Sequence, residues 1–357
     1  MKIDRNRTRK IRCKDIFIGG DSPISIQSMT STDTRNIKET VSQIKRLEEA
    51  GCEIVRVAIP DMEAAKAISE IKKKISIPLA ADIHFDYRLA ITSIEKGIDK
   101  LRINPGNIGD KERVKKVVSK AREREIPIRI GVNAGSLEKS IIEKYGITPY
   151  GLVESAMNHI KILEELDYDK IIVSLKASDV KLTFDAYKLL SERVDYPLHI
   201  GITEAGTIWR GTIKSSIGIG SLLLMGIGDT LRVSLTGDPV EEVKVGREIL
   251  QSLGIRKFGI NFISCPTCGR CQIDLVKLAT KLERELNHIE SPITIAVMGC
   301  AVNGPGEARE ADLGIAGGKN SALLFRKGEI IRKVPEAEII DAVLEEIKNI
   351  DKSLYRL

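Results

Sequence analysis

Four cysteines and a glutamate lie in two short segments in the last quarter of the chain. The first segment reads Cys265-Pro-Thr-Cys268-Gly-Arg-Cys271, and the second reads Cys300-Ala-Val-Asn-Gly-Pro-Gly-Glu307. Thiolates are soft ligands, and a Cys-x-x-Cys pair at a tight turn brings two sulfurs to one metal centre, so the remaining ligands come from elsewhere in the chain. Cys300 and Glu307 can supply them. An iron-sulfur cluster, and with it redox chemistry, is therefore the first hypothesis.

A structural zinc site is the competing interpretation of the same segment. A lone Cys-x-x-Cys suits zinc as well as iron, and the four cysteines together could form a four-thiolate zinc site. Disulfides are the weakest interpretation, because a chain of this length can build a large core without them. Cys13 and Cys52 lie far upstream in apolar segments that are typical of core cysteines.

The composition indicates an ordinary globular protein with room for two domains. The chain has 357 residues, of which 42% are hydrophobic and 30% are charged. The polar start, Met1–Arg7, lacks the apolar stretch of a signal peptide, and the longest apolar run, Ile217–Ile227, is too short to span a bilayer. We therefore expect a cytoplasmic protein that does not bind a membrane.

The net charge of +6 is better explained by a small anion than by nucleic acid. Lysine and arginine are dispersed among acidic residues, and only 4% of residues are aromatic, so no platform for stacking bases is apparent. Several of the basic residues lie inside strand-like segments, where an unpaired charge is costly. These charges need an anion nearby, and we expect no nucleic-acid partner.

Eight short β-branched segments alternate with amphipathic helical patterns and predict an α/β fold, a parallel (β/α)8 TIM-like barrel that extends to about residue 250. An open doubly wound sheet is the alternative, although no Gly-x-Gly-x-x-Gly follows the first strand. The predicted strands are Ile24–Met29, Ile54–Ile59, Leu79–Ile83, Lys100–Ile103, Ile128–Val132, Ile171–Leu175, Leu198–Ile202 and Thr230–Leu235.

The rhythm of the sequence changes after Gly254. Short strand patterns and two helices predict a smaller α+β domain that carries the cysteines, so the predicted domains are residues 1–253 and 254–357. Within the barrel, the connection from Ala134 to Gly151 is longer than the others and is either a lid or an inert excursion.

Polar residues recur where the predicted barrel strands end, which is the face at which barrel enzymes act. Guanidinium groups and an ammonium around one cavity suit a diphosphate, and neutral donors add hydrogen bonds to its oxygens. The Asn104-Pro-Gly-Asn107 turn could present backbone N–H groups as well. The predicted binding residues are Arg56, His84, Arg102, Arg129, Asn133, Lys176, Arg232 and Ser234.

Three residues at this face can move protons. Glu204 is the predicted acid, because a carboxyl group at a strand end in a dry pocket can have its pKa raised enough to donate near neutrality. Asp82 is a second acid-base candidate. His84 is either a catalytic group or one that orients its neighbours by hydrogen bonding.

Four segments together resemble the bacterial 4-hydroxy-3-methylbut-2-enyl diphosphate synthases over nearly the whole chain. They are Cys265-Pro-Thr-Cys268-Gly-Arg, the segment from Gly299 to Ala308, Leu-Arg-Ile-Asn-Pro-Gly-Asn-Ile-Gly and Ser-Leu-Lys-Ala-Ser. Members of this family use a [4Fe-4S] cluster to convert 2-C-methyl-D-erythritol 2,4-cyclodiphosphate into the linear allylic diphosphate, a step of isoprenoid biosynthesis in the methylerythritol phosphate pathway.

The resemblance implies specific roles. The metal ligands would be Cys265, Cys268, Cys300 and Glu307, whereas spacing alone favours four cysteines including Cys271. The eight binding residues named above would hold the diphosphate, and Glu204, Asp82 and Glu307 would be catalytic. The resemblance also implies a homodimer with an active site shared between subunits. Because the chain has no nicotinamide or flavin motif, we expect a ferredoxin or flavodoxin as electron donor.

Two other classes of protein compete with this reading. A non-catalytic, basic, zinc-containing scaffold or nucleic-acid-binding protein would be colourless after anaerobic purification, whereas an iron-sulfur protein would be brown. A radical S-adenosylmethionine barrel would require Cys-x-x-x-Cys-x-x-Cys early in the chain, which this sequence lacks.

Overall fold

The computed structural model describes residues 3–286, 288–300, 306 and 308–350. The chain divides into two compact units, Met1–Ile255 and Arg256–Leu357. Glu307 lies outside the described residues.

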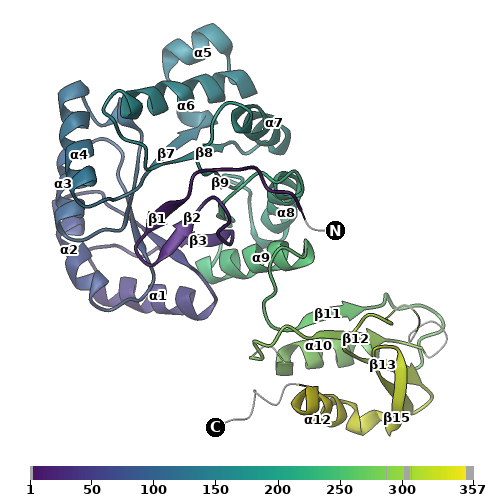
Figure 1. The fold of residues 1–357 in the computed structure, drawn as a ribbon. Coiled ribbons are helices and arrows are strands. Elements are labelled where there is room, and N and C mark those ends of the chain that lie inside the picture. Colours follow the sequence, from purple (N-terminus) through teal and green to yellow (C-terminus); the bar gives the residue numbers. More distant parts are fainter. Residues whose placement is uncertain (1–2, 287, 301–305, 307, 351–357) are drawn as a thin grey trace. The chain divides into compact units, whose positions relative to one another are not determined.

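The first unit is a barrel of eight parallel strands, which confirms the predicted fold (Figure 1). The order around the sheet is β8-β7-β6-β5-β4-β3-β10-β9, and a parallel bridge between Val173 and Leu198 joins its two ends. The last two barrel strands along the chain, β9 and β10, are only two residues long. The strands are β3 (Ser25–Met29), β4 (Ile54–Ala58), β5 (Leu79–Asp82), β6 (Lys100–Ile103), β7 (Ile128–Asn133), β8 (Ile171–Lys176), β9 (His199–Ile200) and β10 (Thr230–Leu231).

Amphipathic helices connect these strands around the outside of the barrel. In α1, for example, Val41, Ile44 and Leu47 recur at helical spacing and are buried, and Asn36 caps the first turn by accepting from the Glu39 N–H. Aspartates cap α2, α3, α4, α7 and α9 in the same way. The helices are α1 (Ile37–Glu49), α2 (Met62–Lys72), α3 (Tyr87–Glu95), α4 (Lys111–Glu123), α5 (Lys139–Tyr145), α6 (Pro149–Glu164), α7 (Val180–Ser191), α8 (Ile208–Leu224) and α9 (Pro239–Ser252).

An N-terminal hairpin that the sequence pattern did not reveal covers the amino-terminal end of the barrel. Its strands β1 (Ile11–Cys13) and β2 (Ile16–Ile18) are antiparallel. Ile11, Cys13 and Ile18 pack against residues at the beginnings of three barrel strands, including Ile54 and Ile172. Cys13 is therefore a core residue, as predicted, and Cys52 is buried as well.

The second unit contains a five-stranded mixed sheet with the order β11-β12-β13-β14-β15. The first three strands are parallel and the last three are antiparallel. Buried apolar side chains of α10, α12 and the sheet form a hydrophobic core, with Leu282, Ile295 and Val343 among its fully buried members. The elements are β11 (Asn261–Ser264), α10 (Leu275–Leu286), β12 (Thr294–Met298), β13 (Leu313–Gly318), β14 (Ser321–Arg326), β15 (Glu329–Pro335) and α12 (Ile339–Ile350).

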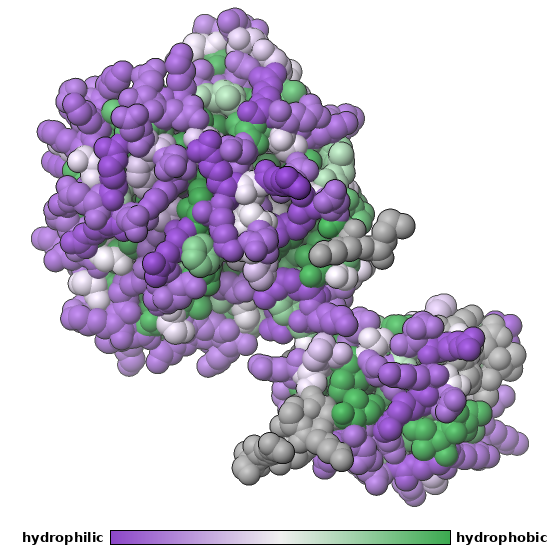
Figure 2. Space-filling view, in the orientation of Figure 1, coloured by the Kyte–Doolittle hydropathy of each residue, from purple (hydrophilic) through white to green (hydrophobic). Residues whose placement is uncertain are grey.

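Hydrophilic side chains cover most of the visible face of each unit (Figure 2). Within the described residues, no helix combines the length and the apolar character needed to cross a membrane.

Candidate active site

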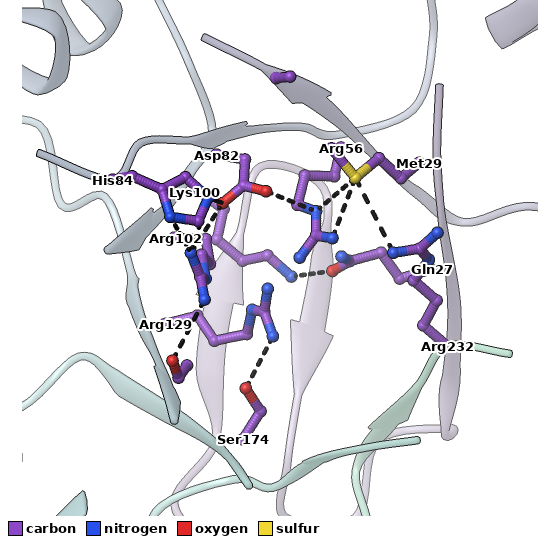
Figure 3. Close-up of polar contacts among 12 residues, drawn as sticks. Gln27, Met29, Arg56, Asp82, His84, Lys100, Arg102, Arg129, Ser174 and Arg232 are labelled. Atoms are coloured by element: carbon purple, nitrogen blue, oxygen red, sulfur yellow. Dashed lines mark hydrogen bonds and ion pairs between the residues drawn. The ribbon is translucent and has the colours of Figure 1, made fainter. Parts of the chain in front are cut away.

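A polar pocket of about 450 Å³, including its open mouth, lies at the carboxyl ends of the barrel strands. Its lining contains all eight of the predicted binding residues together with Asp82, and adds two residues that the sequence analysis did not name, Ser174 and Thr203. Figure 3 shows the polar contacts of the pocket and of the barrel interior beneath it. The lining residues are Arg56, Asp82, His84, Arg102, Arg129, Asn133, Ser174, Lys176, Thr203, Arg232 and Ser234.

The register of the sheet explains why these side chains meet. Asp82 lies opposite Arg102, and Arg102 lies opposite Arg129, on three adjacent parallel strands. Asn133 lies four residues beyond Arg129 on β7, which is two inward-facing positions further on, and pairs with Lys176 of β8. Because alternate residues of a strand point to the same face, partners in register on adjacent strands all point into the barrel.

Asp82 is the anionic centre of the pocket. Its Oδ1 accepts a hydrogen bond from Arg102 Nη1 at 3.2 Å, and its Oδ2 lies 3.6 Å from Arg56 Nε. His84 Nε2 lies 3.5 Å from the same carboxylate. Burial alone would raise the pKa of Asp82, but the charge of Arg56, the His84 hydrogen bond and the charge of Arg102 together hold that pKa well below its usual range. Asp82 is therefore an ionised partner of the arginines and does not suit the role of proton donor.

A second carboxylate, Glu242 of α9, orients Arg232 from outside the barrel. Its two oxygens lie 3.3 Å from Arg232 Nε and 3.2 Å from Nη2, and it also accepts from the Ser28 hydroxyl at 3.0 Å. Glu242 could not be predicted from the sequence, since a glutamate in the first turn of an amphipathic helix usually faces solvent. In the structure Glu242 is only 4% exposed, which distinguishes it from an ordinary surface glutamate.

Two cations of the pocket, Arg129 and Lys176, have no carboxylate bonded to them within the described chain. Arg129 Nη1 donates to Ser174 Oγ at 2.8 Å, whereas its Nε and Nη2 are buried without a partner. Burial, followed by the charges of neighbouring arginines, lowers the pKa of Lys176 well below its ordinary value. Gly201 leaves room for this lysine, because a Cβ there would lie 2.9 Å from Lys176 Nζ. Positive charge without counter-charge at the pocket floor favours an anionic ligand.

Glu204 is placed differently from what the sequence analysis expected. It follows β9 at the same end of the barrel, but its side chain is exposed and does not line the pocket. The dry surroundings that would make it an acid near neutrality are therefore not present within the barrel unit.

The Asn104-Pro-Gly-Asn107 turn is hydrogen-bonded to His159 of α6. The Gly106 N–H donates to His159 Nδ1 at 3.2 Å, so the ring proton lies on Nε2 and is donated to Glu138 Oε1 at 2.8 Å. This hydrogen bond is the main cause that lowers the pKa of Glu138 to about 2. The Gly106 N–H is thus already engaged, and the long connection that contains Glu138 is tied to the helical shell.

Replacing His159 with phenylalanine should lower the free energy of unfolding by about 1–2 kcal/mol, because both hydrogen bonds are lost from a buried position. Asparagine can place its amide oxygen where Nδ1 lies, so H159N should retain part of this stability. Urea unfolding of the full chain, followed by circular dichroism, measures the difference. Equal stability of wild type and H159F would show that the Glu138–His159–Gly106 chain contributes nothing.

In the second unit, the loops after β11 and β12 bring the cysteine segments together. The Gly299 N–H donates to Cys265 Sγ at 3.2 Å, and the Cys271 N–H donates to the Cys268 carbonyl at 3.0 Å. A Cβ on Gly299 would lie 2.6 Å from Cys271 Sγ, so this glycine, which precedes Cys300, packs directly on Cys271.

The donor set of this loop cluster fits a soft metal centre. Backbone hydrogen bonding at Arg270 lowers the pKa of the exposed Cys268 thiol, which favours the thiolate that iron binds. Within the described residues, no three cysteine, histidine or acidic side chains already lie close enough to share one metal ion. The predicted ligand Glu307 lies outside those residues, so the four-ligand set stays a prediction.

Comparisons with known proteins identify relatives of both units. The family described as "GcpE TIM-barrel domain" matches residues 8–247, and that described as "GcpE protein C-terminal domain" matches residues 261–349. A curated relative from Clostridium acetobutylicum, named 4-hydroxy-3-methylbut-2-en-1-yl diphosphate synthase (flavodoxin), is 60% identical over 97% of this chain and 100% of its own. Another of the same name, from Caldanaerobacter subterraneus subsp. tengcongensis, is 62% identical over 98% of each chain.

Among solved structures, a dihydropteroate synthase from Stenotrophomonas maltophilia matches with a TM-score of 0.51. The match covers 69% of this chain and 98% of that one, at 9% sequence identity. A likeness at this identity shows the barrel fold alone.

Proposed function

The chain belongs to the GcpE family, and on that premise we propose that it is an oxidoreductase that converts 2-C-methyl-D-erythritol 2,4-cyclodiphosphate into (E)-4-hydroxy-3-methylbut-2-enyl diphosphate. The conversion consumes two electrons and two protons and releases one water. The observation that carries the proposal is the buried cationic pocket at the carboxyl end of the barrel, in a chain that also gathers four cysteines.

The pocket supports binding of a diphosphate. Arg56 and Arg102 are already oriented by Asp82, and Arg232 is oriented by Glu242, so their guanidinium groups lose little freedom when an anion binds. Within the described residues no carboxylate is bonded to Arg129, so its guanidinium group can pair with the anion, and Lys176 adds a hydrogen-bond donor to the same pocket. Asn133, Ser234 and His84 add hydrogen-bonding groups around the rim.

We propose a [4Fe-4S] cluster held by Cys265, Cys268, Cys300 and Glu307. When bound, such a cluster supplies electrons one at a time and a Lewis-acidic iron. The Gly299 N–H that points at Cys265 Sγ stabilises thiolate charge at this ligand. We propose that Cys271 is not a ligand, because its Sγ lies 3.2 Å from the Ile273 carbonyl and packs on Gly299.

Proton delivery is assigned to groups at the pocket mouth. Asp82 stays ionised and orients Arg56, Arg102 and His84, so it acts as a positioning residue. Glu204 remains the proposed proton donor, because it follows β9 at the same end of the barrel as the pocket and its side chain is exposed there. The names of the relatives support a flavodoxin as the electron donor. We further propose that the protein acts in the cytoplasm.

We also propose a homodimer, and an apolar stripe on α8 supports it. Trp209, Ile213, Ile217 and Leu224 recur at helical spacing on one side of α8 and are all exposed, Trp209 to 76%. A stripe of this kind on a helix of the outer shell is typical of a self-association surface. Sedimentation of wild type against Ile213→Glu tests this proposal, and an unchanged mass would contradict it.

The family resemblance further implies that the cluster unit of one subunit serves the barrel of the other.

Anaerobic turnover tests the function. The purified holoenzyme should be brown, and with reduced flavodoxin it should convert the cyclic diphosphate into the linear allylic diphosphate, detected by phosphorus NMR. A colourless zinc protein that leaves the cyclic diphosphate unchanged would support the scaffold alternative instead.

A further inference from the structure

A layer of fully buried polar side chains lies beneath the pocket, on the amino-terminal side of the arginines. Lys100 of β6 precedes Arg102 by two residues, so its side chain also points into the barrel, about 6.6 Å deeper. Gln27, His199 and Thr230 occupy the same interior from β3, β9 and β10, and all four side chains are at most 1% exposed. This layer belongs neither to the proposed ligand contacts nor to the proposed proton donors.

Lys100 is a buried amine whose hydrogen bond goes to a neutral group. Its Nζ donates to Gln27 Oε1 at 2.6 Å, and Figure 3 shows the two side chains meeting across the barrel interior. Negative charge on Cys13 or Cys52 would raise the pKa of this amine. However, burial raises the pKa values of these two thiols to about 11 and about 12, so both are uncharged near neutrality. The titratable and charged groups that face this interior are Cys13 (β1), Cys52, Arg56 (β4), Asp82 (β5), Arg129 (β7), Lys176 (β8) and His199 (β9).

The layer also has hydrogen-bonding capacity to spare. In the described part of the barrel, Gln27 Nε2, both ring nitrogens of His199 and the Thr230 hydroxyl are buried without a partner. Donors and acceptors of this kind can rearrange around an added charge, with or without bridging water. The interior is therefore equipped to accept a change in the protonation of Lys100.

On the basis of the proposed function, we propose that binding of a diphosphate-class anion in the pocket draws one proton from solvent onto Lys100. Arg129 and Arg56 repel a charge on Lys100 in the free protein, and an anion bound to these guanidinium groups cancels that repulsion. Binding and protonation are thus coupled, and each favours the other.

The pKa of Lys100 in the free protein sets the direction of the coupling between binding and protonation. Burial, reinforced by Arg129 and Arg56, lowers the pKa of Lys100 to about 7, so the amine is largely neutral above this pH. A bound anion raises that pKa, and the complex then holds more protons than the free protein. Affinity should therefore increase as the pH falls toward the free-state pKa, and become flat below it. Each phosphorus of the cyclic diphosphate carries a single acidic oxygen, and only second ionisations of phosphate groups titrate at about pH 6, so the ligand itself contributes no proton.

Titration calorimetry tests the proposal on the oxidised holoenzyme without reductant, where the cyclic diphosphate binds but does not turn over. The binding enthalpy, measured in two buffers of different ionisation enthalpy, gives the number of protons taken up. We expect uptake of about one proton at about pH 8, a clear decrease at about pH 6, and Kd values that weaken by up to about tenfold per pH unit above neutrality. Binding without proton uptake at about pH 8 would overturn the inference, whereas absence of binding would overturn the proposed function.

Two variants assign the proton. Lys100→Met removes the amine and should abolish the uptake, while Gln27→Met removes only its hydrogen-bond partner and should retain the uptake. Uptake that persists in K100M would place the proton on Lys176 or His199 and overturn the assignment. If K100M does not fold, the pH dependence of wild type still decides whether binding and protonation are coupled.

Discussion

Replacing Cys265, Cys268 or Cys300 with serine should abolish cluster binding and activity, whereas Cys271→Ser should retain both. Serine is a poor ligand for iron in place of thiolate, and the loss of one of three thiolates leaves too few soft donors. Cys271 differs because its sulfur packs against Gly299 and lies 3.2 Å from the Ile273 carbonyl. Iron and sulfide analysis of the anaerobically purified variants, together with their visible spectra, measures the outcome.

Cys271→Ser is the matched control in this set, because it removes a thiol from the same segment. Loss of iron in this variant would restore the four-cysteine site that spacing alone favours. Retention of a normal cluster in C300S would remove Cys300 from the ligand set and separate the two cysteine segments functionally.

Replacing Arg102 with alanine should lower kcat/KM for the cyclic diphosphate roughly 100-fold, mainly through a higher KM. This corresponds to a loss of about 3 kcal/mol of transition-state stabilisation. The substitution removes a guanidinium group from the pocket and also leaves Asp82 with one fewer counter-charge, since Arg102 Nη1 donates to its Oδ1 at 3.2 Å. Steady-state kinetics under anaerobic conditions give the two parameters separately.

Arg88→Ala provides the control for Arg102→Ala. Arg88 is an exposed arginine of α3 that pairs with Asp86 and does not line the pocket, so its removal should leave both parameters near wild type. The iron content and visible spectrum of R102A should match wild type, because Arg102 lies in the barrel unit. An unchanged KM in R102A would exclude this arginine from the binding site.

The positions of the eight barrel strands could be predicted from the sequence because each strand is a short β-branched run between helical patterns. The same rule failed for the N-terminal hairpin, whose strands are three residues long and are stabilised by packing against the barrel. Strands β9 and β10 are shorter than predicted: each keeps two paired residues, although Leu198, Ile202 and Val233 beside them remain buried.

The pocket arginines could be found because charged residues at strand ends of a barrel converge. Residues that act from other places could not be found in this way. Glu242 reaches Arg232 from a helix, and Met29 accepts hydrogen bonds from Arg56 through a sulfur that a sequence pattern would assign to the core. Lys100 lies at a strand start, where a lysine is ordinarily exposed, and only the structure shows that its side chain is fully buried beneath the pocket.

Electron counting during turnover decides whether this chain is a cluster-dependent reductase of the cyclic diphosphate. Stoichiometric amounts of reduced flavodoxin are added anaerobically to the oxidised holoenzyme and the cyclic diphosphate, and the linear diphosphate formed is compared with the electrons consumed. We predict about two electrons for each linear allylic diphosphate and no product with C300S, because the ring opening is a two-electron reduction that depends on the cluster. Product formed without consumption of electrons, or formed equally by C300S, would contradict it.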